Sequence, residues 1–281
     1  MGRLALDAET VLSYFLISAG AALFLPLTLT QILTGPDRNL RGGALISLFL
    51  IVIGLCMGIL SSPLDRDPIF ILREFLGLSY DVSTLVRTFS LLLVLSILVY
   101  LVVLLYTTKT ELLLKVFSAL GAACAALVLV FLAIHDTQAA VVVSEALALH
   151  GATLVVNACV TGYSLFCLSL PADEDLLGRL SWPVAVLRIV LATEALVSLT
   201  FVLSNILVGG LAFGPEPAAR WTCLALWFLF LAAGVGGGIW SLRRLRKRPD
   251  ARPEKRTVTS AAIIALICSF IVNGMLQALV S

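Results

Sequence analysis

The sequence predicts an all-α, polytopic membrane protein built as a bundle of about eight transmembrane helices. Of its 281 residues, 60% are apolar and 13% are charged, whereas soluble domains have about 45–50% apolar and about 25% charged residues. The apolar residues gather in runs long enough to cross a bilayer, which requires about 20 residues. Because these runs take up more than half of the chain, we expect residues 1–281 to form a single transmembrane domain, not a soluble enzyme or a nucleic-acid-binding protein.

Apolar runs bounded by charged or turn residues define the expected spans, which are residues 11–33, 42–62, 83–106, 116–135, 149–171, 183–209, 220–242 and 257–279. The first run is longer than the apolar core of a cleavable signal peptide, so we expect it to be a span. The connection 136–148 is the least distinct, because it carries Asp136 and Glu145 but is otherwise apolar. A seven-span protein is the alternative interpretation of this stretch.

Lysine and arginine residues predict the orientation. The connections after odd-numbered spans carry thirteen of them, eight of which lie between Arg243 and Arg256, and the other side carries four. Because basic loops stay in the cytoplasm, we expect both termini outside and the 243–256 connection inside, in the cytoplasmic (inner) membrane. This connection can also bind anionic membrane lipid. On the outer side, residues 67–81 are too short and too charged to span, and we expect a short interfacial helix at 69–76.

Polar residues inside the spans follow helical stripes. One span carries His150, Thr153, Asn157, Thr161 and Ser164 at spacings of three and four, so they share a face. Another carries Glu194 near mid-membrane and Ser198 one turn later, and we expect Glu194 to face the bundle interior. With the orientation above, several polar residues lie in the half of the membrane nearer the outside, and together they suggest a cavity that opens to the outside. These residues are Arg87, His135, Asp136, His150, Asn157, Asn273 and Gln277. The alternative is that these groups only join helices by hydrogen bonds.

Four short segments carry a resemblance to a known family: YFLISAG at 14–20, GILSSP at 58–63, STL at 83–85 and AIHDT at 133–137. With the length, the span count and the outside termini, they resemble the membrane anchor subunit of the dimethyl-sulfoxide-reductase family of molybdenum enzymes. Such a subunit holds an iron–sulfur protein and a molybdopterin catalytic subunit at the membrane and oxidises a quinol nearby. The chain departs from the family pattern at Ile59, where a His is usual, and near Thr88, where an acidic residue is usual.

The resemblance implies a subunit of an oxidoreductase complex for electron transport in anaerobic respiration, with a quinol, expected to be menaquinol, as its cofactor. Because imidazole changes charge near neutral pH and a carboxylate can orient it, His135 with Asp136 is the expected proton acceptor, and His150 is the alternative acceptor. The expected binding residues are Arg87, His150, Asn157, Asn273 and Gln277. The implied partners are the iron–sulfur and molybdopterin subunits, which would dock on residues 63–81 and 136–148. We expect neither haem nor an iron–sulfur cluster in this chain, because its six cysteines form no CxxC pair and fall in apolar runs.

Two other functions remain open from the sequence. A secondary transporter or channel would use the eight helices as a path, with Glu194 coupling proton movement. An assembly or sensory membrane protein would carry out no chemistry of its own. Co-purification separates them, because only the anchor subunit belongs to a complex that contains molybdenum and iron.

Overall fold

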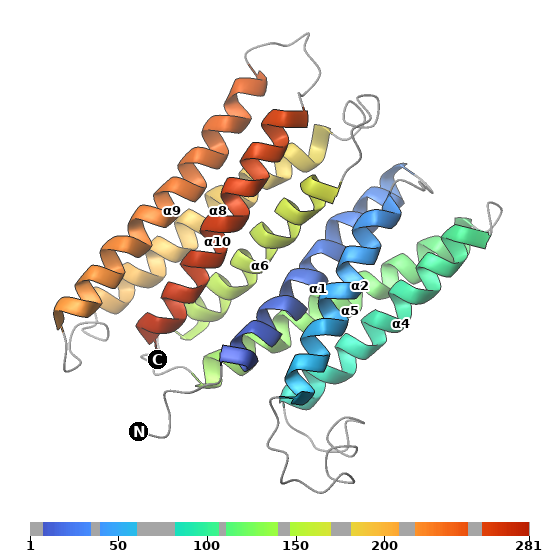
Figure 1. Ribbon diagram of the computed structural model, residues 1–281, viewed down its shortest axis with the longest axis horizontal. Coiled ribbons are helices and arrows are strands. Elements are labelled where there is room, and N and C mark those ends of the chain that lie inside the picture. Colours follow the sequence, from blue (N-terminus) through green and yellow to red (C-terminus); the bar gives the residue numbers. More distant parts are fainter. Residues whose placement is uncertain are drawn as a thin grey trace, which may run out of the picture. The chain divides into compact units, whose positions relative to one another are not determined.

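The computed structural model describes residues 8–34, 40–60, 82–106, 111–139, 147–169, 181–207, 217–246 and 255–280. These residues form eight helices (Figure 1): α1 (Ala8–Thr34), α2 (Arg41–Leu60), α4 (Val82–Tyr106), α5 (Glu111–Ala139), α6 (Leu147–Ser169), α8 (Ser181–Leu207), α9 (Pro217–Arg246) and α10 (Lys255–Val280). Each expected span corresponds to one of these helices, and α5 and α6 are separate helices. The interfacial helix expected at 69–76 lies outside the described residues.

Six helices fit membrane spans in length and composition. Their apolar stretches, within the described residues, run over Leu12–Ile32, Arg41–Gly58, Val82–Leu105, Leu112–His135, Leu149–Ser169 and Ala185–Ser204. Helices α9 and α10 contain the shorter apolar stretches Leu224–Ile239 and Val258–Val272. The chain is therefore all-helical where it is described, and its helices are those of a multi-pass membrane protein.

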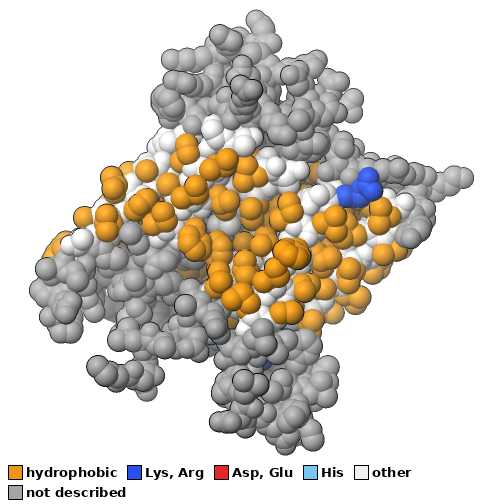
Figure 2. Space-filling model, in the orientation of Figure 1, with side chains coloured by type: hydrophobic (Ala, Val, Ile, Leu, Met, Phe, Trp, Pro, Cys, Tyr) orange, Lys and Arg blue, Asp and Glu red, His pale blue; other side chains and the backbone are white. Residues whose placement is uncertain are grey.

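The helices expose many large apolar side chains and bury several polar ones, unlike those of a soluble bundle. Phe49, for example, is 66% exposed and Leu196 is 67% exposed. Hydrophobic side chains make up most of the coloured surface in view (Figure 2). Serine, threonine, asparagine, histidine and glutamate side chains are among the buried residues. Lipid as the surrounding solvent explains this distribution, because apolar surface costs nothing there and unsatisfied polar groups are expensive.

The chain divides into two compact units, Met1–His135 and Asp136–Ser281. In the first unit, which we call unit 1, α1 and α2 are antiparallel and closely packed, and α4 packs against both. Helix α5 contacts α1 at Gly121, which lies directly under the ring of Phe24. It also joins through Phe131, whose ring stacks on Phe89 of α4 with centroids 5.4 Å apart.

In the second unit, unit 2, each helix packs against two others in the cyclic order α6, α8, α9, α10. Two hydrophobic clusters fill its interior. The Leu191 cluster consists of Val160, Cys167, Leu187, Leu191, Val258, Ala261, Ala262 and Ala265. The Trp227 cluster consists of Phe201, Val202, Leu224, Trp227, Leu231 and Val272. On α8 and α10, which contribute to both clusters, the two clusters are separated by more than a turn.

Candidate functional site

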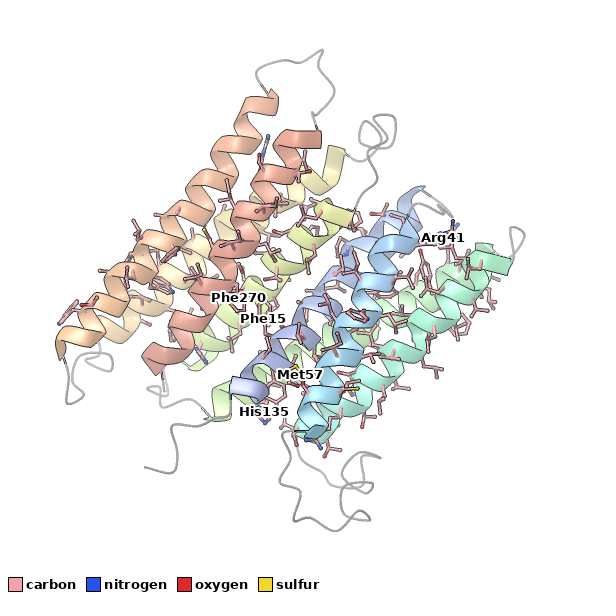
Figure 3. All side chains as sticks on the ribbon, viewed as in Figure 1. Phe15, Arg41, Met57, His135 and Phe270 are labelled. Carbon is pink, nitrogen blue, oxygen red and sulfur yellow. The ribbon has the colours of Figure 1, made fainter. Side chains whose placement is uncertain are left out.

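A tyrosine–histidine pair lies at one end of unit 1. The hydroxyl of Tyr14, in the second turn of α1, lies 3.4 Å from Nε2 of His135, near the end of α5. The rings meet edge to face, with centroids 5.0 Å apart and planes at 71°. Both side chains are half-buried. His135 and Met57 of α2 lie at this end of the unit, and Arg41 lies at the opposite end (Figure 3).

Arg87 reaches the same end of unit 1 from α4. The Phe89–Phe131 stack fixes the register of α4 against the antiparallel α5. Two residues back from Phe89 is Arg87, and four residues on from Phe131 is His135, so both lie beyond the stack on the same side. Arg87 is half-buried. The described helices of unit 1 therefore bring a guanidinium, an imidazole and a phenol to one end.

These three groups have the chemistry that a quinol would require. An imidazole nitrogen can accept a proton from a quinol hydroxyl. A phenol hydroxyl both donates and accepts hydrogen bonds, so Tyr14 can orient the His135 ring. A guanidinium only donates and stays charged, which suits an oxygen on which negative charge develops. The backbone of Asp136 belongs to α5, and its side chain lies outside the described part of the chain.

The polar stripe of α6 faces the interior of unit 2, as the spacing predicted. His150, Thr153, Asn157, Thr161 and Ser164 are each at most 2% exposed. His150, in the first turn of α6, lies against the ring of Phe201 on α8, with centroids 5.4 Å apart. The Thr153 hydroxyl donates to the carbonyl of Leu149 at 2.8 Å.

Asn157, Thr161 and Ser269 form a hydrogen-bonded network between α6 and α10. The Asn157 amide donates to the carbonyl oxygen of Ser269 at 3.2 Å. In return, the Ser269 hydroxyl donates to Asn157 Oδ1 at 2.7 Å. The Thr161 hydroxyl lies 3.2 Å from the Ser269 hydroxyl. The alternative interpretation of the polar residues, that they join helices by hydrogen bonds, therefore applies to Asn157.

Glu194 on α8 also faces the interior of unit 2, as expected. It is 3% exposed. Among the described residues, its Oε1 has no hydrogen-bond partner, and neither does the hydroxyl of Ser198 one turn later. The same is true of the Ser164 hydroxyl and the Trp227 indole nitrogen. Buried polar atoms without partners are costly, so they mark the part of unit 2 where a function would leave its trace.

Of the seven residues predicted for the quinol site, four have side chains that the structure describes, and these four fall into two groups. Arg87 and His135 lie at one end of unit 1, and His150 and Asn157 lie inside unit 2. Asn273 and Gln277 are on α10, but their side chains lie outside the described residues, as does that of Asp136. A single site built from both groups stays a prediction.

Sequence reasoning missed Tyr14 as a functional residue. It counted Tyr14 only among the segments that carry the family resemblance. The available signal was an aromatic hydroxyl near the outer end of the first span, at the depth expected for His135. The pairing itself depends on α1 packing against α5, which residue spacing within one helix cannot predict.

The cysteines do not form a metal site within the described helices, where no three His, Cys, Asp or Glu side chains come together as ligands. Cys124, Cys167 and Cys268 are buried, which is common for small apolar residues. Cys56 is exposed on α2. Comparison with protein-family models gives no match, and comparison with curated proteins gives none either.

Proposed function

We propose that this chain is the membrane anchor subunit of a molybdopterin oxidoreductase complex, in which it binds and oxidises a quinol and passes the electrons to an iron–sulfur partner. The observation that carries this proposal is the contact between the Tyr14 hydroxyl and His135 Nε2 at 3.4 Å. It lies at the end of unit 1 to which Arg87 also extends. A proton acceptor, an orienting hydroxyl and a cation are the groups that quinol oxidation requires.

In the proposed reaction, a quinol loses two protons and two electrons. His135 accepts the first proton from a quinol hydroxyl, with Asp136 as its carboxylate neighbour in the chain. Tyr14 holds the imidazole ring in place. Arg87 stabilises the negative charge that develops on the quinol oxygen. The electrons leave to the iron–sulfur subunit and then to the molybdopterin subunit, and menaquinol is the proposed donor.

We propose eight transmembrane spans with both termini outside and the 243–256 connection in the cytoplasm of a cell with an inner membrane. The ends of unit 1 support this orientation. Arg41 begins α2 and Lys115 lies in the second turn of α5, so both basic residues are at the end opposite His135. Basic residues at the cytoplasmic end and the quinol residues at the outer end agree with the positive-inside rule. The partner would then dock from outside, on residues 63–81 and 136–148, most of which lie outside the described part of the chain.

Substitution of the two histidines in the assembled complex tests the proposal. We expect His135→Ala to lower quinol-driven turnover, while turnover with an artificial donor that bypasses this subunit persists. His150→Ala is the matched variant, because it removes the other histidine of the chain from the other unit. If His150→Ala and not His135→Ala lowers quinol-driven turnover, the quinol binds in unit 2. If the double variant keeps full quinol-driven activity, or if the chain purifies without molybdenum and iron, the proposed function is wrong.

A further inference from the structure

A polar layer crosses the interior of unit 2 between the Leu191 cluster and the Trp227 cluster. Asn157 of α6 and Ser269 of α10 are hydrogen-bonded in this layer. On α9, a Cβ added to Gly234 would lie 2.5 Å from Cβ of Cys268, the neighbour of Ser269, so Gly234 is at the same level. On α6, α8 and α10 the Leu191 cluster lies on one side of this level, and on α8, α9 and α10 the Trp227 cluster lies on the other side.

Glu194 is the member of the layer from α8. His150 packs on Phe201. Helices α6 and α8 are antiparallel, because Cys167 and Leu187 share the Leu191 cluster, whereas Leu149 packs against the Trp227 cluster, which contains Phe201. Seven residues on from His150 is Asn157, and seven residues back from Phe201 is Glu194. The same register sets Ser198 level with Thr153. The Glu194 carboxyl also lies within electrostatic reach of the Cys268 thiol.

We propose that Glu194 is a proton-binding site in the core of unit 2, which exchanges its proton with water at the end of the unit that carries His150. Between that end and Glu194 lie the hydroxyls of Thr153 and Ser198, both buried. Each hydroxyl has one proton to donate and can accept a hydrogen bond. To hand on a proton, Thr153 must release the bond that it donates to the Leu149 carbonyl, and Ser198, which has no hydrogen-bond partner among the described residues, must form one. On uptake, an O–H bond forms at a Glu194 carboxyl oxygen and the carboxylate becomes a neutral acid. On release, the proton returns by the same hydroxyls.

A proton fits this site better than a metal cation does. Hard cations require several oxygen ligands around the carboxylate. At the level of Glu194, α9 contributes Gly234, which has no side chain, and α10 contributes the Cys268 thiol. The Asn157 amide oxygen already accepts a hydrogen bond from Ser269. A proton requires only one oxygen, and Glu194 Oε1 has no partner among the described residues.

Few titratable groups face Glu194 from the helices packed around it. On α6 the buried ones are His150 and Cys167, and on α10 the buried one is Cys268. The side chains of α9 that the structure describes include no titratable group. Arg188, on α8 itself, is six residues from Glu194, which places it about 120° around the helix and about 9 Å along it. No described cation therefore faces Glu194 to hold it permanently ionised. The proposal goes beyond the proposed function and does not depend on it, because it concerns no quinol and no partner.

Infrared spectroscopy of the full chain in lipid vesicles tests the proposal. We expect a carbonyl stretch of a protonated carboxylic acid that is absent in Glu194→Gln and is retained at a shifted frequency in Glu194→Asp. It should shift in D₂O and lose intensity as the pH rises. If Glu194 contributes no such band at any pH, its carboxyl stays ionised and the proposal is wrong. The proposal is equally wrong if the band persists without exchange or titration, because Glu194 is then a fixed structural acid.

Two threonines of α6 test the route of exchange. Thr153→Val and Thr161→Val remove the same buried hydroxyl from the same face of α6, on opposite sides of Glu194. We expect Thr153→Val to slow the D₂O shift of the Glu194 band several-fold and Thr161→Val to leave its rate unchanged. The reverse result would show that Glu194 exchanges with the opposite end of unit 2. Equal rates in all three proteins would exclude the hydroxyl route.

Discussion

The Ser13 hydroxyl of α1 donates a hydrogen bond to the carbonyl oxygen of Gly54 on α2 at 2.7 Å. The reciprocal hydrogen bond comes from the Ser47 hydroxyl of α2, which donates to the carbonyl oxygen of Gly20 on α1, also at 2.7 Å. The two segments, SYFLISAG at 13–20 and SLFLIVIG at 47–54, have serine, phenylalanine, leucine, isoleucine and glycine at matching positions. The antiparallel pair is therefore locally two-fold symmetric, which lets each serine satisfy its hydroxyl where the helices are closest.

Alanine in place of Gly54 should destabilise unit 1. The added Cβ would lie 2.7 Å from Cγ1 of Ile17 and 2.8 Å from the carbonyl oxygen of Ser13. Since backbone cannot move aside as a side chain can, the helices must separate, and overpacking of this kind costs about 1–3 kcal/mol. We expect Gly54→Ala and Gly20→Ala to lower the free energy of unfolding in detergent, measured by thermal or chemical denaturation. Ile17→Ala should not rescue Gly54→Ala, because the contact with the Ser13 carbonyl remains.

Gly42→Ala is the control for this pair, because an added Cβ there meets nothing within 4 Å. Alanine is favoured over glycine inside a helix by about 0.5–1 kcal/mol, so this variant should be neutral or slightly stabilising. Equal losses of stability in all three glycine variants would show that the close approach of α1 and α2 does not decide the result.

A compensating pair of substitutions tests the packing at the polar layer of unit 2. A Cβ on Gly234 would lie 2.5 Å from Cβ of Cys268, so Gly234→Ala should lower stability by about 1–3 kcal/mol. Cys268→Gly removes the opposing atom. We expect the double variant to be more stable than Gly234→Ala alone, as measured by a double-mutant cycle of unfolding free energies. Gly236→Ala, where nothing lies within 4 Å, should show no such coupling to Cys268→Gly.

The helices could be predicted from the sequence because the apolar runs are long and their breaks are polar. Their ends were less accurate. The span expected at 116–135 is helix Glu111–Ala139, since an apolar run measures the hydrocarbon thickness while a helix can continue into the interface. The burial of Glu194 and of the α6 stripe could also be predicted, because spacing decides which residues share a face. Partners on other helices could not. Tyr14 next to His135, and Ser269 next to Asn157, depend on which helices are neighbours.

Ser269→Ala should destabilise unit 2 through its partners. It removes the hydroxyl that donates to Asn157 Oδ1 and leaves that buried oxygen without this partner. The expected loss is about 1–2 kcal/mol, typical of a buried or membrane hydrogen bond. Thr200→Val is the matched control, because the Thr200 hydroxyl is exposed and bonds only to its own helix, at the Leu196 carbonyl. If both variants lose equal stability, the network between α6 and α10 contributes nothing of its own.

Reporter fusions test the proposed orientation. A reporter that is active only in the cytoplasm should be active when fused within residues 243–256, because eight lysine and arginine residues lie there and basic connections are retained inside. A reporter at the C-terminus should be inactive. Activity at both places would imply that α10 does not cross the membrane. A reporter that is inactive in the 243–256 connection would put that connection outside, which would move the Tyr14–His135 end of unit 1 away from the side proposed for partner docking.

Substitution by phenylalanine should affect stability to a different extent at two tyrosines of unit 1. The Tyr100 hydroxyl is buried and donates to Gln31 Oε1 at 3.0 Å. Among the described residues, Gln31 Nε2 has no partner, so Tyr100→Phe removes a bond that Gln31 cannot spare. The Tyr14 hydroxyl is only part-buried, and its contact with His135 is long, at 3.4 Å. Tyr100→Phe should therefore lower the unfolding free energy by about 1 kcal/mol, and Tyr14→Phe should lower it by less.

The order should reverse for function. If His135 is the proton acceptor, Tyr14→Phe leaves its ring without the hydroxyl that orients it, so quinol-driven turnover per folded complex should fall several-fold while turnover with an artificial donor is kept. Tyr100→Phe should leave both rates unchanged, because Tyr100 bonds to Gln31 on the last turns of α1, far along that helix from Tyr14. Measuring both variants for unfolding and for both rates separates a site residue from a packing residue. Should Tyr14→Phe turn over quinol as fast as the parent protein, Tyr14 has no part in quinol oxidation, and the contact that carries the proposed function is only helix packing.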